Sequence, residues 1–131
     1  MKSFFAIPSA WAAIQTWESG PSFDISYDAS KGQLKIDATV PDNQYLAVAY
    51  GRGMINTDIV FFPGSATDDL KDLWSTYYGN PPEDSNNDYV DTVKSQENGN
   101  HVYTTYRLLD TGDPEDAVIE CGKIHQYSWV G

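Results

Sequence analysis

A methionine on a glycine-flanked turn is the first feature of this sequence that could do chemistry. Met54 follows Gly51-Arg52-Gly53, and this turn separates two apolar runs, residues 45–50 and 59–62. Glycine allows a sharp turn and a close approach of the backbone to another group. A thioether on such a turn either fills a gap in a core or serves as a soft metal ligand. The sequence is compatible with both interpretations of Met54.

Two charged residues lie in strands that otherwise carry apolar neighbours. Asp58 precedes the run 59–62, and Arg107 lies within residues 101–109, which are rich in β-branched and aromatic side chains. A buried charge persists only when it is matched and hydrogen-bonded. We therefore predict that Asp58 and Arg107 form a buried ion pair.

Patterns for catalysis are missing from the sequence. It contains no Gly-x-Ser-x-Gly, and two unanchored histidines, His101 and His125, do not make a catalytic triad. Residues 51–53 alone are too weak a signature for phosphate binding. We therefore expect a protein that is not an enzyme.

Acidic residues gather in two loops. Residues 84–91 offer oxygen ligands at alternate positions, which suits a hard cation. Tyr89 and Ser95, however, stand where an EF-hand requires Gly and Glu. We interpret residues 84–91 as a solvated acidic loop, and the acids of residues 110–116 as turn and cap residues.

Size and charge narrow the class of protein. The chain has 131 residues, enough for one domain with a proper core. Its formal net charge of −11 argues against nucleic acid or an anionic membrane as partner, and fits a cationic partner protein or metal ions. No run reaches the roughly 18 apolar residues of a membrane span. The single Cys121 cannot form an internal disulfide.

Short strands must position these residues. Residues 33–40 alternate cleanly between apolar and polar, and the turn 28–32 joins them to residues 22–27 as a hairpin. About nine strands with turns at roughly 8–12-residue spacing indicate an all-β fold, an antiparallel immunoglobulin-like β-sandwich. We expect strands over residues 22–27, 33–40, 44–50, 59–62, 68–78, 89–94, 101–109, 117–121 and 124–130.

The remaining assignments follow from the spacing of apolar residues and from the residues that end helices and strands. Residues 68–78 fit a strand or a helix, and we favour a strand. Residues 1–19 are read as an N-terminal extension with a short helix over residues 9–19, and residues 20–131 as the sandwich. The predicted core includes Leu34, Ile36, Ala38, Val40, Leu46, Val48, Ile59, Phe61, Tyr106, Leu108 and Trp129.

The order of several short motifs resembles the DOMON family, named for the N-terminal domain of dopamine β-monooxygenase. The likeness covers roughly residues 20–131 and is moderately specific, because each motif is short but the order is kept. The motifs are residues 45–50 with 51–54, 57–60, Leu73-Trp74, 81–84, 106–113 with Asp116, and 128–131.

This resemblance implies a β-sandwich that binds a ligand and does not catalyse. Known members are haem b cytochrome domains or are suspected sugar-binding modules, and they usually lie outside the cytoplasm. The resemblance therefore predicts a haem b electron-transfer domain, extracellular or otherwise extracytoplasmic, with a redox or assembly partner protein. The sequence has no Cys-x-x-Cys-His, so covalent haem attachment is excluded.

In the haem-binding members, the loop methionine and a histidine near the last strands are the axial ligands. The resemblance thus assigns the iron to Met54 and to His125 or, second, His101. The predicted haem slot also includes Gly51, Gly53, Tyr50, Phe61, Tyr127 and Trp129.

Two other functions remain open. Sugar rings stack on exposed aromatic side chains, so a carbohydrate-binding module is the first alternative. A structural subunit that has lost its ligand is the second. The aromatic residues that would serve the first alternative are Trp11, Trp17, Trp74, Tyr77 and Tyr78.

Overall fold

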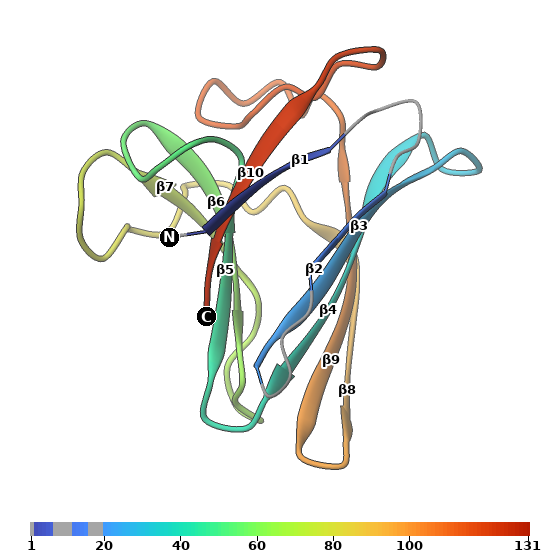
Figure 1. The fold of residues 1–131 in the computed structure, drawn as a ribbon, viewed down its shortest axis with the longest axis vertical. Coiled ribbons are helices and arrows are strands. Elements are labelled where there is room, and N and C mark those ends of the chain that lie inside the picture. The colour runs from blue at the N-terminus through green and yellow to red at the C-terminus, as the bar shows by residue number, and fades with distance from the viewer. Residues whose placement is uncertain (1, 7–11, 16–19) are drawn as a thin grey trace.

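The computed structural model describes residues 2–6, 12–15 and 20–131, with side chains from residue 20 onward (Figure 1). Within these residues the chain forms ten strands and no helix. The strands are β1 (Lys2–Ala6), β2 (Ala12–Gln15), β3 (Ser22–Asp28), β4 (Gln33–Pro41), β5 (Tyr45–Ala49), β6 (Thr57–Pro63), β7 (Lys71–Ser75), β8 (Val90–Glu97), β9 (Asn100–Leu108) and β10 (His125–Val130).

The strands form two antiparallel five-stranded sheets that face each other (Figure 1). One sheet has the order β1-β10-β5-β6-β7, and the other has the order β2-β3-β4-β9-β8. The predicted antiparallel β-sandwich is therefore confirmed. Residues 68–78 contain the strand β7, as favoured from the sequence.

The hairpin of β3 and β4 forms where alternation predicts it, and the two strands pair in continuous register. In the turn between them, Asp28 Oδ1 accepts a hydrogen bond from the backbone N–H of Ser30 at 2.9 Å. Gly32 closes the turn with a φ of +65°, a backbone conformation that favours glycine. Every second residue of β4 is buried, so one face of the hairpin joins the core.

The main core lies between the two sheets. Its aromatic contacts cross the interface, and Phe62 packs edge to face on Tyr103 with ring centroids 5.3 Å apart. The core contains Phe23, Ile25, Leu34, Ile36, Ala38, Val40, Leu46, Val48, Val60, Phe62, Leu70, Tyr89, Tyr103, Ile119, Tyr127 and Trp129.

The predicted inner face of β9 is wrong by one residue. Leu108 is 49% exposed and Tyr106 is only partly buried, whereas Tyr103 and Arg107 are fully enclosed. The polar groups are tolerated inside because they find partners: the Tyr103 hydroxyl donates to the carbonyl of Pro63 at 2.6 Å. Hydrophobicity alone therefore gives the wrong buried face for this strand.

The strand β6 is apolar on both faces, and the prediction placed its wrong face in the main core. Val60 and Phe62 point between the sheets. Ile59 is buried in a second, smaller cluster on the other face of the sheet, against which Phe61 is partly buried. This outer cluster lies at the floor of the candidate site described below.

Two further assignments differ from the sequence-based expectation. Residues 12–15 form the strand β2, so the predicted helix over residues 9–19 is wrong there, and its other residues, with Trp11 and Trp17, lie outside the described part. Residues 117–121 are irregular, although the Ile119 N–H donates to the Leu109 carbonyl at 2.8 Å. Among the described residues there is no helix long and apolar enough to cross a membrane.

Candidate functional site

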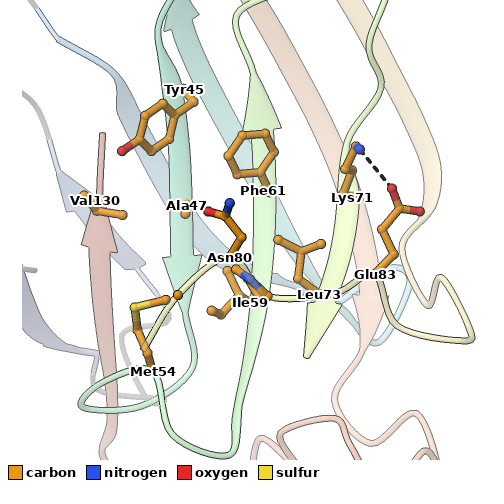
Figure 2. Close-up of a pocket in the computed structure, with 12 residues that line it drawn as sticks. Tyr45, Ala47, Met54, Ile59, Phe61, Lys71, Leu73, Asn80, Glu83 and Val130 are labelled. Carbon is orange, nitrogen blue, oxygen red and sulfur yellow. Dashed lines mark ion pairs between the residues drawn. The ribbon is translucent and has the colours of Figure 1, made fainter. Parts of the chain in front are cut away.

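An apolar groove of about 720 Å³ runs along the outer face of the sheet β10-β5-β6-β7 (Figure 2). Strand register builds its floor, because Val130 lies opposite Ala47, and Ala47 lies opposite Phe61. A second row places Ile59 opposite Leu73. Since side chains alternate along a strand, these residues all project away from the main core.

The segment after β7 forms one wall of the groove. It returns along the free edge of β7, where Leu73 forms an isolated antiparallel bridge with Glu83. Lys71 Nζ lies 2.9 Å from Glu83 Oε1 and closes this side with an ion pair (Figure 2). Gly79, Asn80 and Pro81 complete the wall.

An aromatic pair lies on the groove floor. The rings of Tyr45 and Phe61 stack with centroids 5.6 Å apart and an interplanar angle of 21°. Tyr45 is 44% exposed, which is high for an aromatic residue on a central strand. The groove therefore offers flat apolar surface together with a charged pair and an amide at its rim.

Met54 lies at one end of the groove, on the loop that joins β5 to β6 (Figure 2). This loop is tied to β10: Ser128 Oγ donates to the Gly51 carbonyl at 2.5 Å, and Arg52 Nε donates to Gln126 Oε1 at 2.6 Å. A Cβ at Gly53 would meet no atom within 4 Å, so the space beside this glycine is open. Of the predicted ligands, Met54 is the one that the structure places in the groove.

The two histidines lie elsewhere. His125 begins β10 and lines a separate cavity of about 230 Å³, where its Nε2 lies 2.9 Å from the Glu120 carbonyl oxygen. His101 is buried, and its Nε2 lies 2.5 Å from Asp42 Oδ1, beside the turn that precedes β5. Because the Met54 loop follows β5, His101 is at the opposite end of the sandwich. The structure does not bring Met54 together with either histidine.

Three aromatic residues predicted for the slot are inside the sandwich instead. Trp129 and Tyr127 are core residues, and Trp129 packs edge to face on Phe23 at 6.0 Å. Tyr50 packs on Tyr127 with ring centroids 5.4 Å apart. Phe61 is the predicted aromatic residue that does line the groove.

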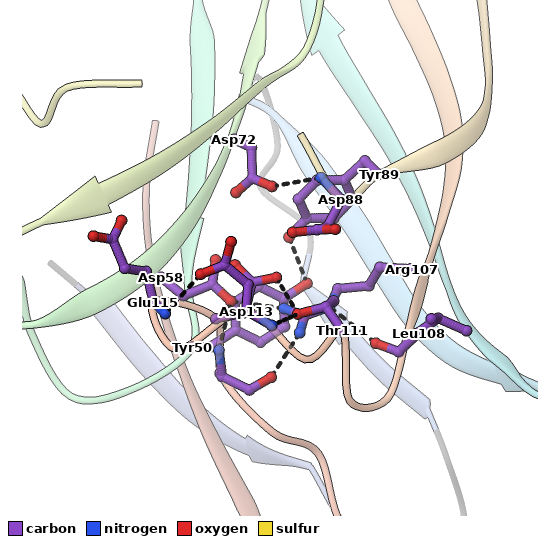
Figure 3. Close-up of polar contacts among 12 residues, drawn as sticks. Tyr50, Asp58, Asp72, Asp88, Tyr89, Arg107, Leu108, Thr111, Asp113 and Glu115 are labelled. Atoms are coloured by element: carbon purple, nitrogen blue, oxygen red, sulfur yellow. Dashed lines mark hydrogen bonds and ion pairs between the residues drawn. The ribbon is translucent and has the colours of Figure 1, made fainter. Parts of the chain in front are cut away.

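The predicted pair of Asp58 and Arg107 is present in the structure and is buried. Arg107 Nη1 donates to Asp58 Oδ2 at 2.6 Å, and both side chains are at most 2% exposed (Figure 3). The Ala117 N–H donates to the same Asp58 oxygen at 2.9 Å, and Arg107 Nη2 donates to the Ala117 carbonyl at 2.6 Å. Tyr50 covers the guanidinium at 4.9 Å. Burial raises the pKa of Asp58 to about 6, against the opposing effect of Arg107.

Most of the groove residues were not singled out from the sequence. The available signal was the two-sided apolar character of β5 and β6, which pointed to a sheet covered on both faces. The structure leaves the outer face of these strands open as a groove. The unpredicted lining residues are Tyr45, Ala47, Ile59, Lys71, Leu73, Gly79, Asn80, Pro81, Glu83 and Val130.

The two-sheet sandwich, with a groove on one outer face, places this chain among small β-sandwich modules. The chain belongs to the DOMON domain family, whose model matches residues 21–130. No curated protein sequence matches it. Among solved structures it is similar to the cytochrome domain of Myriococcum thermophilum cellobiose dehydrogenase, with 14% identity and a TM-score of 0.47. That match covers 74% of this chain and 52% of the other, so this chain spans about half of the cytochrome domain's length.

Proposed function

We propose that this DOMON domain is a non-catalytic binding module whose ligand lies in the groove, and that this ligand is haem b. The observation that carries the proposal is the position of Met54 at the end of an apolar groove of about 720 Å³. Flat apolar surface suits a porphyrin, and a thioether is a known axial ligand of haem iron. Bound haem would supply one-electron transfer, at a potential raised by a methionine ligand.

The groove fits haem in its size and in its apolar lining, and the sulfur of Met54 is one donor atom for the iron. His125 and His101 do not fit as the second donor, because one lines a different cavity and the other is buried against Asp42. The proposal therefore assigns Met54 to the iron and assigns neither histidine. An extracytoplasmic location and a redox partner with a basic surface complete the proposal, the latter in keeping with the net charge of −11.

Replacing Met54 tests the proposed ligand. Haemin titrated into the purified protein is expected to give a Soret band that saturates at one haem per chain. Loss of an outer-shell partner already weakens metal binding by about 10- to 100-fold, so Met54→Ala should weaken haemin binding by at least about tenfold. The dissociation constant from the absorbance titration is the measurement.

Two controls make that titration specific. All variants carry Cys121→Ser, because the exposed thiol of Cys121 could bind iron by itself. Met54→Leu preserves the apolar volume without the sulfur, and should weaken binding as much as Met54→Ala does. Equal haemin affinity in all three proteins, or no Soret band in any, would contradict the proposal.

Carbohydrate is the second candidate ligand, and the observation in its favour is the exposed ring of Tyr45. Sugar rings stack on aromatic faces, while their hydroxyls need charged and amide partners such as Lys71, Glu83 and Asn80. Tyr77 and Tyr78, 59% and 74% exposed, lie on the segment that leads into the groove wall. Trp74, by contrast, lies on the side of Asp58 and is only partly exposed.

If the groove binds a sugar, a glycan array should show a small set of bound glycans, and Tyr45→Ala should abolish that binding. Val93→Ala, on the exposed edge strand β8, is the matched control and should leave it unchanged. A protein that binds neither haemin nor any glycan would instead fit the structural-subunit alternative.

A further inference from the structure

One ion pair lies in the wall of the otherwise apolar groove. Lys71 Nζ is 2.9 Å from Glu83 Oε1, and the other described residues that line the groove carry no charge (Figure 2). Strand register places Lys71 on β7 directly opposite Phe61 on β6. The lysine therefore belongs to the same row of the sheet as the aromatic floor, where the Phe61 ring stacks on Tyr45.

The groove wall does not depend on this ion pair. Its backbone is fixed to β7 independently, by the bridge of Glu83 with Leu73 and by the Asp84 N–H, which donates to the Asp72 carbonyl at 2.9 Å. The side chains of Lys71 and Glu83 are 44% and 64% exposed. An exposed ion pair contributes little to stability, because water solvates the separated charges well. The Glu83 carboxylate can therefore leave Lys71 while the wall stays in place.

A cation is rare on this molecule, which makes its position in the groove informative. The chain has 8 Lys and Arg against 19 Asp and Glu, so an anionic ligand is repelled by the molecule as a whole. The hydrogen bond to Glu83 raises the pKa of Lys71, so its side chain is an ammonium group at neutral pH. The amide of Asn80, which also lines the groove, is a second donor. Together they offer a place for an acid group at the edge of a ligand.

We propose that Lys71 binds a carboxylate of the ligand in place of Glu83, so that the groove selects a flat apolar ligand with an acid group at its edge. This inference rests on the proposed function, because haem b is such a ligand: its porphyrin carries two propionate carboxylates on one edge. Lys71 exchanges one carboxylate partner for another, so binding leaves no unpaired ammonium group. The displaced Glu83 side chain, already largely exposed, returns to water.

The two members of the ion pair should have opposite effects on haem binding. Lys71→Met keeps most of the apolar stem but removes the donor, and should weaken haemin binding by roughly tenfold or more, as expected for a charged hydrogen bond. Glu83→Gln removes the competing carboxylate and should tighten haemin binding by about two- to fivefold, as expected for the release of an exposed pair. A pair that only held the wall would give weaker binding in both variants.

Haemin and haemin dimethyl ester separate recognition of the carboxylates from recognition of the ring. The ester has the same iron and porphyrin but no free carboxylate, so Lys71→Met should bind it within about twofold of the wild type. Soret titrations in the Cys121→Ser background measure both dissociation constants, after melting temperatures show that each variant is folded. Lys123→Met, which breaks an exposed ion pair with Glu120 away from the groove, is the matched control and should bind haemin as the wild type does.

The titrations distinguish failure of this inference from failure of the proposed function. Three results would overturn the role of Lys71 and leave haem as the ligand: unchanged haemin affinity in Lys71→Met, equal weakening for haemin and its ester, or weaker haemin binding in Glu83→Gln. A wild type that gives no Soret band with haemin would overturn the proposed function and this inference together. The expected result is a loss specific to haemin in Lys71→Met and a gain in Glu83→Gln.

Discussion

Arg107→Met is expected to destabilise the domain by roughly 3–5 kcal/mol, because it leaves the buried carboxylate of Asp58 without its charge partner. The methionine keeps much of the apolar volume of the arginine stem, so the loss reports mainly on charge and hydrogen bonding. Arg107 Nη1 donates to Asp58 at 2.6 Å inside a site where both residues are at most 2% exposed. Urea unfolding at pH 8 measures the effect with Asp58 ionised.

Matched variants identify the cause of that loss. Arg52→Met, at an exposed arginine, should change stability by about 0.5 kcal/mol or less. Adding Asp58→Asn to Arg107→Met should recover part of the lost stability, because the uncompensated charge is removed. The raised pKa of Asp58 means that protonation at low pH also removes this charge, so the loss should be smaller at pH 5 than at pH 8. Exposed ion pairs contribute roughly 0–1 kcal/mol to stability. An Arg107→Met variant whose free energy of unfolding lies within about 1 kcal/mol of the wild-type value would therefore show that the pair behaves as a surface pair.

Alternation and turn residues predicted the sandwich well, because its two-residue period is a local property of the chain. The β3–β4 hairpin is the clearest case, since its turn and both strands can be recognised within residues 22–40. The buried ion pair could also be predicted, since Asp58 and Arg107 each interrupt an apolar strand. To predict that the two residues meet, it was enough to assume that both faces of these strands are buried.

The candidate site was harder to predict because it depends on which face of each strand turns outward. Strand β6 is apolar on both faces, so periodicity could not assign Ile59 and Phe61 to the outer cluster. For β10, one step along the strand separates Trp129 in the core from Val130 in the groove. His125 was assigned to the iron because it lies on the last strand, near where the resemblance places a histidine ligand, and its actual cavity depends on the irregular segment before it.

A group of neighbouring carboxylates, those of Asp58, Asp72, Asp88 and Asp116, illustrates the limit of reading loops one at a time. Residues 84–91 fail the local pattern of a calcium loop and were interpreted as solvated. In the structure Asp88 comes from that loop, but Asp58, Asp72 and Asp116 come from two strands and another turn. Such a group is assembled by long-range packing, and no single stretch of sequence contains it.

The most direct test of the proposed function is to fill the groove. Ala47 lies at the centre of its floor, between Val130 and Phe61, and Ala47→Trp would occupy the space of a ligand. Haemin binding should fall by at least about tenfold, which corresponds to a loss of about 1.4 kcal/mol of binding free energy. Val93→Trp, at a position 65% exposed on β8, adds the same side chain away from the groove and should bind haemin as the wild type does.

The measurement is a Soret titration of these three proteins in the Cys121→Ser background, after their melting temperatures show that each is folded. A saturable Soret band in the wild type and Val93→Trp, lost in folded Ala47→Trp, is the predicted result. Equal haemin affinity of Ala47→Trp and the wild type would contradict the assignment of the groove as the ligand site.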